Sequence, residues 1–503
     1  MTLRLPSLLA TSLLLAGVAV QAQSLRIGLA EDPDVLDPTL ARTFVGRIVF
    51  AALCDKLLDV DEKLTITPQL ALSWEWSADN KALTMKLRPG VTFHDGEKLD
   101  AAAVKFNLER HKTMAGSNRR GELAPLATVD VVDAMTVRLN LSAPFSPLLA
   151  TLADRAGMMV SPKAAQAAGD RFGSKPICSG PFKFVERVAQ DRIVFERYDG
   201  YWNKANIHFD KITYTPVVDA TVRLANLKAG QFDFIERVAP SDIEKLQTDK
   251  RYKLSRITEI GYQGLTINIG KSEQAQKNPL GRDARVREAL ELSLDRQGLA
   301  QVVMDNEAAV GNQWVAPSNA FYAKSLPMPK RDVARARALL KEAGVPNPSF
   351  TLVTPTTSDA QRLALVIQAM TRDAGFDVKI QATEFATSLN MADKGEFEAY
   401  VLAWSGRADP DGNAFSFHGC KQPLNYSGYC NAETDALLTQ ARTLRDVAER
   451  KKVYEQIAAK VLKERPIIYL YHRNWLWAYN TKLAGVRNVP DGLLRITGLK
   501  MAP

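Results

Sequence analysis

Apolar and polar residues alternate in several segments of the first half of the chain, which is the pattern of half-buried strands. The clearest is residues 83–88, LTMKLR; a Pro-Gly turn, a short strand-like segment at 91–93 and a helix-like segment at 99–111 follow it. In that helix we expect Ala102, Phe106 and Leu108 to form the buried stripe. Other strands are predicted at residues 24–30, 129–132, 136–141, 182–188, 192–197 and 208–216. Helices are predicted at residues 44–58, 146–153, 221–229 and 240–248.

The second half is more helical. It opens on an alternating strand at 262–270, and residues 283–304 suit one or two helices. Residues 330–345 predict a helix that ends at Gly344, and a strand, a helix and a strand follow at 348–355, 360–374 and 377–385. The apolar run at 465–480 predicts a strand that crosses back to the first half. This order indicates a second α/β lobe.

The first 22 residues have the pattern of an export signal. Arg4 supplies the positive charge, residues 8–20 are largely apolar, and Val20-Gln21-Ala22 places small residues at a cleavage site. The alternative, a short membrane anchor, needs a longer apolar run of about 20 residues. We expect cleavage after Ala22 and a soluble, periplasmic mature protein.

The net charge of +9 falls to +8 when Arg4 leaves with the signal. Because Lys and Arg are spread along the chain without a run of five, the surplus indicates a weakly basic, solvated surface. We expect no nucleic-acid partner.

Four cysteines in an exported chain favour disulfides. Three pairings are possible. The ten-residue spacing of Cys420 and Cys430 favours a local bridge between them, which leaves Cys54 to pair with Cys178. A thiol nucleophile is the weaker interpretation, since no CxxC occurs.

The sequence carries no catalytic constellation. The five histidines show no metal-binding spacing, and no serine lies in a GxSxG motif. Acid pairs such as Asp59/Asp61 and Asp409/Asp411 are as typical of turns as of catalysis. No phosphate-binding glycine loop occurs. These absences give no support for an enzyme and predict neither a cofactor nor a metal site, and any ATPase that acts with this protein must be another polypeptide.

Seven segments together resemble the peptide-binding class of solute-binding proteins that serve ABC importers, which is family 5, with dipeptide, oligopeptide and nickel binders. In order they are TITPQLALSWEW, LRPGVTFHDG, SGPFKFVE with RYDGYW, RDARVREALELSLDR, DVARARALLKEAG, NYSGYC and PIIYLYHRN. Each is weak alone, but their shared order across nearly the whole mature chain is specific.

This resemblance implies an α/β, two-lobed periplasmic-binding-protein fold of class II, cluster C type, with a subdomain inserted in the first lobe. Hinge crossings are expected near Ile260 and Tyr471. Lobe I is expected at residues 23–44, 179–260 and 474–503, the inserted subdomain at 45–178 and lobe II at 261–473. Ligands of such proteins lie between the lobes, which close around them.

The segment after the strand-like AYVLAW is the leading candidate for ligand contact. In family members that bind peptides, a Trp matching Trp404 packs on the ligand, and an Asp three residues later pairs with its amino group. Here that position is Arg407, which favours an anionic ligand group. If the loop is shifted relative to that of the peptide binders, Asp409 or Asp411 takes the place of the acid that is missing at position 407. The alternatives are a core role for Trp404 and an ion pair for Arg407.

Other cleft candidates lie in loops of both predicted lobes. They are Glu31 with Asp32 and Asp34, Tyr262 and Gln263, Asn312 with Gln313 and Trp314, and Asn425 and Tyr426.

The prediction is a monomeric periplasmic protein that captures a short peptide or peptide-like solute and delivers it to an inner-membrane permease. A non-peptide anionic solute, such as an opine, an acidic sugar or a metal chelate, is the alternative cargo. An exported peptide hydrolase and a periplasmic chaperone or sensor are weaker alternatives.

Overall fold

A large sheet of twelve strands runs through the molecule in this computed structural model, which describes residues 23–502. Ten strands follow the order β16-β15-β17-β13-β18-β11-β1-β10-β9-β8, and β12 and β14 also pair with β18. Their bounds are β1 Ser24–Leu29, β8 Phe182–Val188, β9 Arg192–Arg197, β10 Lys211–Pro216, β11 Phe234–Ile235, β12 Tyr252–Thr258, β13 Tyr262–Ile267, β14 Ala308–Val310, β15 Ser349–Pro355, β16 Asp377–Thr383, β17 Ala399–Trp404 and β18 Ile467–Asn480.

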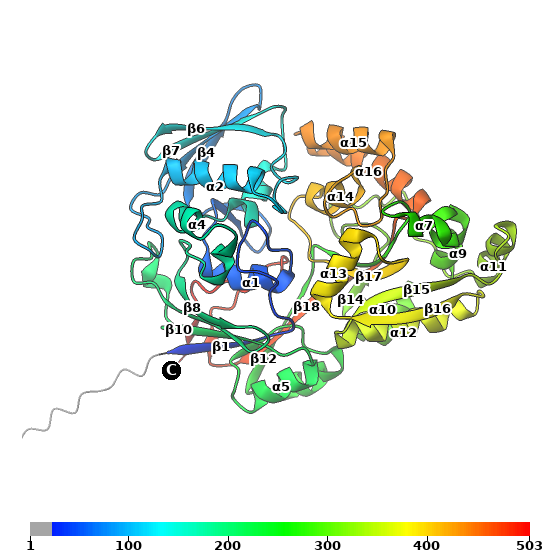
Figure 1. The fold of residues 1–503 in the computed structure, drawn as a ribbon. Coiled ribbons are helices and arrows are strands. Elements are labelled where there is room, and N and C mark those ends of the chain that lie inside the picture. The colour runs from blue at the N-terminus through cyan, green and yellow to red at the C-terminus, as the bar shows by residue number, and fades with distance from the viewer. Residues whose placement is uncertain (1–22, 503) are drawn as a thin grey trace, which may run out of the picture.

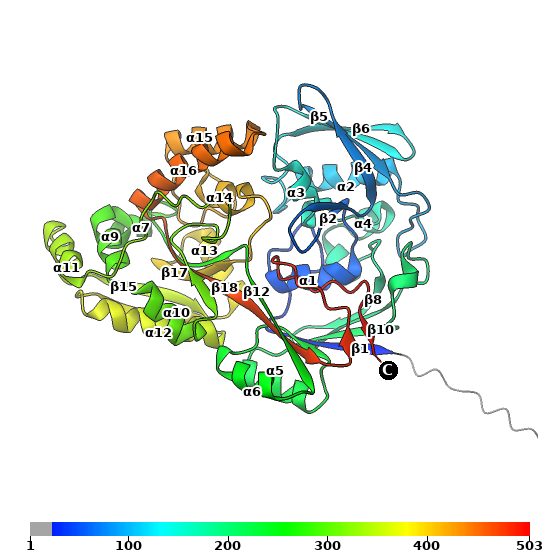
Figure 2. The ribbon, with the colours of Figure 1, turned by 180° about the vertical axis from the view of Figure 1, so that it is seen from behind.

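Strand β18 joins the two halves of the molecule, which lie on either side of it (Figures 1 and 2). Its first part pairs with β13 as far as Tyr471, and its second part pairs with β12 from Asn474 onward. The chain also passes from β12 to β13 at residues 259–261. The change of partner along β18 and the passage from β12 to β13 both fall where the hinge crossings are predicted. The lobe boundaries themselves stay a prediction.

A separate four-stranded antiparallel sheet, in the order β4-β5-β7-β6, occupies part of the predicted inserted subdomain. Its strands are β4 Ala71–Trp76, β5 Ala82–Leu87, β6 Leu126–Asp133 and β7 Thr136–Leu141. Helix α2 (Ala101–Thr113) packs on β6 and β7. Two short two-stranded ladders complete the strands: β2 Leu58–Val60 with β3 Ile66–Pro68, and β19 Leu483–Ala484 with β20 Lys500–Met501.

Most of the remaining helices pack around the large sheet, and many of them belong to the second half of the chain (Figure 1). They are α1 Phe44–Leu53, α3 Leu148–Leu152, α4 Pro162–Ala168, α5 Ala220–Lys228, α6 Ile243–Thr248, α7 Glu273–Lys277, α8 Pro279–Arg282, α9 Ala284–Leu292, α10 Arg296–Met304, α11 Val333–Glu342, α12 Ser358–Arg372, α13 Phe385–Lys394, α14 Asp411–His418, α15 Ala432–Thr443 and α16 Val447–Glu464.

Three local predictions need correction. Helix α1 ends five residues early, because Cys54 has extended backbone angles and β2 begins at Leu58. In α2, Ala102 is exposed and Phe106 only half-buried, since the face that packs carries Ala101, Val104, Leu108 and His111. Residues 91–93 form no strand: Thr92 makes a single bridge to Lys98 around a tight turn.

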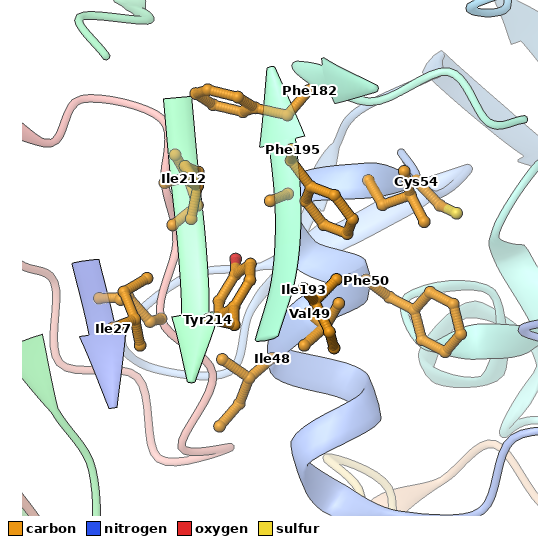
Figure 3. Packing of buried hydrophobic residues seen from close by; sticks show 14 of the residues in the cluster. Ile27, Ile48, Val49, Phe50, Cys54, Phe182, Ile193, Phe195, Ile212 and Tyr214 are labelled. Atoms are coloured by element: carbon orange, nitrogen blue, oxygen red, sulfur yellow. The ribbon is translucent and has the colours of Figure 1, made fainter. Parts of the chain in front are cut away.

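The packing between α1 and the first half of the large sheet forms the largest buried cluster. Ile48, Val49 and Phe50 of α1 lie beside Ile193 of β9 and Tyr214 of β10 (Figure 3). Although α1 lies at the start of the predicted inserted subdomain, its buried face belongs to this core. The subdomain sheet has a core of its own, built from residues such as Leu83, Met85 and Leu139.

The four cysteines form two disulfides, Cys54–Cys178 and Cys420–Cys430. This is the predicted pairing. The first joins the end of α1 to residues preceding β8 and so closes a long loop, whereas the second closes a ten-residue loop.

Candidate ligand-binding site

A cavity lies where loops from the two halves meet, and we name it the main cavity. The first half contributes Glu31, Arg42 and Arg237, and the second contributes Asp359, Leu402 and Trp404. Glu31 follows β1 and Arg237 follows β11, while Asp359 lies in the first turn of α12. The side chains therefore come from strand ends and helix starts, as is common for sites in α/β proteins.

Two smaller cavities adjoin the main cavity. The second cavity shares Arg237, Thr357, Asp359, Arg473 and Trp475 with it and continues along apolar residues of α10. The third cavity shares Trp404 and Leu424 with it and lies on the side of Asp154 and Arg407. Trp404 thus separates the main cavity from the third.

Trp404 is half-buried and held in place. Its Nε1 donates a hydrogen bond to Oδ1 of Asn413 at 2.8 Å, and its ring packs edge-on against Phe417 with centroids 4.8 Å apart. The same Asn413 oxygen accepts from the Arg407 backbone N–H at 2.8 Å. A fixed aromatic ring that lines a cavity is suited to packing on a ligand.

Arg407 is buried and its charge is already paired. Its Nε lies 3.0 Å from Oδ2 of Asp154, which also accepts from Nη2 of Arg47 at 2.6 Å. The guanidinium stacks over the Trp404 ring, 4.3 Å from its centroid. Burial, opposed by Asp154, lowers the pKa of Arg407 to about 10, so the group stays protonated at neutral pH. The alternative role, an ion pair between the two halves, is observed, and contact of Arg407 with an anionic ligand group stays a prediction.

The two acids offered as substitutes are also engaged. Asp409 accepts two hydrogen bonds of 2.6 Å from the guanidinium of Arg450, and Asp411 lies 3.1 Å from Nε of Arg442. Burial raises the pKa of Asp411 to about 6. Both carboxylates line the third cavity rather than the main one. Their role in binding an amine stays a prediction.

Three other predicted residues line the main cavity: Glu31, Gln263 and Tyr426. Glu31 accepts a hydrogen bond of 2.9 Å from Nη1 of Arg237. Its neighbours do not reach the cavity: Asp32 pairs with Arg187 at 3.0 Å, and Asp34 bonds to Thr43 in a turn.

The remaining candidates lie in the core and do not line the main cavity; they are Tyr262, Asn312, Gln313, Trp314 and Asn425. Trp314 packs among His418, Tyr454 and Tyr469. Asn312 and Asn425 bond to nearby loop backbone. Amide side chains in turn-rich loops bind loop backbone as readily as they bind ligand, so their pattern alone is not diagnostic.

Apart from Glu31, the sequence did not point to the charged residues of the main cavity, which are Arg42, Arg237, Asp359 and Arg473. Arg473 forms an ion pair with Glu259 at 3.2 Å, and Arg42 forms one with Asp393 across the two halves at 2.5 Å. For Asp359 a signal existed, because it follows a predicted strand and begins a predicted helix. Such a position at the carboxyl end of a strand often faces a ligand in α/β proteins.

Within residues 23–502 no group of His, Cys, Asp and Glu is arranged to hold a metal ion. The same part of the chain contains no helix that is both long and apolar enough to cross a membrane. The predicted signal, residues 1–22, lies outside the described residues.

Two lobes that share a crossing strand, with a cavity lined from both, define the class of this molecule: a two-lobed periplasmic-binding-protein fold of mixed α/β type, as predicted. The model of bacterial extracellular solute-binding proteins, family 5, matches residues 65–424, and the chain belongs to this family.

Relatives of known name support this assignment. The chain is 30% identical over 473 residues to the glutathione-binding protein GsiB of Pectobacterium atrosepticum, covering 91% of this chain and 90% of GsiB. The solved structure of AgaA with agropinic acid, from A. tumefaciens R10, superposes with a TM-score of 0.87 at 26% identity, covering 95% of this chain and 99% of AgaA. The oligopeptide-binding protein AppA of Bacillus subtilis, with a nonapeptide, gives a TM-score of 0.87 at 26% identity, covering 96% of this chain and 100% of AppA. The protein is thus a substrate-binding protein of an ABC importer and not an enzyme.

Proposed function

We propose that this protein captures a short peptide or a peptide-like solute, such as glutathione, in the main cavity and delivers it to its permease. The observation that carries the proposal is the main cavity itself, which combines aromatic side chains with both signs of charge. Peptides present apolar groups, an amine and a carboxylate, and need all three kinds of partner. Glutathione and a nonapeptide are among the ligands named for its relatives.

The rest of the transport cycle follows from this proposal. The protein acts as a monomer in the periplasm after removal of residues 1–22, and a separate ATPase drives the permease. Pairs such as Arg42–Asp393 hold the two lobes together over the ligand, and their opening by hinge rotation releases it.

A non-peptide anionic solute is the second candidate cargo. The main cavity contains three arginines, Arg42, Arg237 and Arg473, against two acids, Glu31 and Asp359. This surplus of guanidinium groups favours an acidic ligand, as agropinic acid in AgaA illustrates.

Native purification distinguishes the two classes of cargo. The protein is isolated from its own periplasm and denatured gently, and the released small molecule is identified by mass spectrometry. A short peptide or a glutathione-like molecule is the expected result. An opine, an acidic sugar or a metal chelate would establish the second candidate instead, and the absence of any bound solute, combined with no binding of peptides or glutathione, would contradict the proposal.

Replacement of the cleft tryptophan tests where the ligand lies. Trp404→Ala is expected to weaken affinity for the released ligand by about 10- to 100-fold, because contact with a buried aromatic ring contributes roughly 1.5–3 kcal/mol. Isothermal titration calorimetry measures this loss, and denaturant unfolding checks that the fold persists. Trp404→Phe, which keeps a ring, should retain most of the affinity. Unchanged binding by Trp404→Ala would place the ligand elsewhere.

A further inference from the structure

The junction between the main cavity and the second cavity holds an unusual concentration of buried charge. Seven charged side chains gather there from both halves of the molecule. They are the guanidiniums of Arg223, Arg237 and Arg473 and the carboxylates of Glu31, Glu236, Glu259 and Asp359. With Arg362, which also lines the second cavity, four cationic groups stand against four carboxylates.

Three of the four carboxylates are already committed to neighbouring protein groups. Glu31 accepts from Arg237 at 2.9 Å, and Glu259 accepts from the Arg473 backbone N–H at 3.0 Å and from its Nε at 3.2 Å. Glu236 accepts from the Ala30 backbone N–H at 2.9 Å. The side chains of Glu259 and Glu236 are also buried, with exposed fractions of 0% and 1%, whereas Glu31 lines the main cavity with only 12% of its side chain exposed.

Asp359 differs from these three in exposure and in pairing. Its side chain is 41% exposed and lines both cavities, and Nη1 of Arg473 lies 3.6 Å from Oδ2, beyond hydrogen-bond distance. Burial alone would raise the pKa of Asp359, but Arg473 and Arg237 outweigh it and lower the pKa, so the carboxylate is ionised at neutral pH. Arg362, one turn further along α12, is exposed and makes no ion pair within 4 Å among residues 23–502.

We propose that Asp359 binds a cationic group of the ligand, an ammonium or a guanidinium, at the junction of the main and second cavities. A ligand cation there occupies the accepting positions of the partly exposed Asp359 carboxylate that protein groups leave open. Closure excludes water, which strengthens this charge-assisted contact. The inference rests on the proposed function, because it names the chemistry by which the same site selects its solute.

This placement makes Asp359 a determinant of specificity. Ligands that carry a free amine near one end are selected over otherwise equal ligands in which the amine is acylated. The selection follows from desolvation, since an acylated nitrogen leaves the carboxylate without a cationic partner in the closed cleft.

Matched probes test the inference. The full mature protein is freed of endogenous solute by unfolding and refolding, and isothermal titration calorimetry is run with glutathione, trialanine and the N-acetylated form of each. Whichever of glutathione and trialanine binds the wild type more tightly serves as the probe. Asp359→Asn is expected to weaken binding of that probe by roughly tenfold or more and to leave binding of its N-acetylated form unchanged. Asp373→Asn, at the other end of the same helix and paired with Arg331 on the surface, is the control and should bind like the wild type.

The possible outcomes separate the inference from the proposed function. The inference is wrong, while the proposed function stands, if the wild type and Asp359→Asn bind the probe with equal affinity. The same holds if the wild type binds the N-acetylated form as tightly as the probe. If the wild type binds neither free amine, both are contradicted. Thermal unfolding of Asp359→Asn shows whether an observed loss of affinity reflects the site or the fold.

Discussion

Removal of the disulfide between Cys54 and Cys178 is expected to lower the free energy of unfolding by about 5 kcal/mol, estimated from loop-closure entropy. The two cysteines are 124 residues apart, and both are buried beside the core that α1 forms with the large sheet. Without the bridge the unfolded chain gains the conformational freedom of this long loop. The double variant Cys54→Ala/Cys178→Ala, unfolded in guanidinium chloride, measures the loss.

The second disulfide provides the matched control. Cys420 and Cys430 close a loop of ten residues, for which the same relation gives about 3 kcal/mol. Cys420→Ala/Cys430→Ala should therefore be the more stable of the two double variants by about 2 kcal/mol. Equal losses, or a greater loss from the short loop, would contradict the loop-closure explanation.

Loss of the Asp154 carboxylate is the second large effect we expect. The carboxylate meets Arg47 at 2.6 Å, Arg407 at 3.0 Å and Arg155 at 3.9 Å, and all four side chains are buried. Asp154→Asn would leave three buried guanidiniums without their shared counter-charge, at a cost of roughly 3–5 kcal/mol. Arg407→Ala should cost less, because Asp154 keeps Arg47. Denaturant unfolding at neutral pH compares the two variants.

Acid pH gives an independent check on Asp154. Burial opposes ionisation, but Arg407, Arg47 and Arg155 hold the pKa of this carboxyl well below its usual range. Its contribution is complete above the unfolded-state pKa of about 4 and declines as the pH falls further, because the unfolded chain takes up the proton first. The difference in stability between the wild type and Asp154→Asn should narrow by about 1.4 kcal/mol per pH unit below pH 4. A difference that stays constant from pH 7 to pH 3 would exclude this role.

Local sequence determined most of the elements and the family of this protein. Alternating segments became β5, β7 and β13, and the helix predicted at 330–345 became α11, followed by Gly344 at a positive φ of 74°. These features depend on side-chain periodicity and on single backbone conformations, which a short stretch of sequence specifies. The order of the seven segments likewise sufficed for the family, and the spacing of the cysteines favoured the pairing that the structure shows.

The tertiary structure alone decided which charges are free and which are paired. Arg407 has the chemistry to bind an anion, but it already pairs with Asp154 from the other half of the molecule. Trp314 has the chemistry of a ligand contact but lies in an aromatic core, whereas Asp359 drew no attention until the fold placed it on the cavity between the lobes. The physical reason is the separation along the chain. Hydrophobic periodicity depends on neighbouring residues, but the partner of a charge is supplied by residues distant in sequence. What the sequence determined is therefore the scaffold, and what only the fold decided is the charge pattern with which the scaffold meets its ligand.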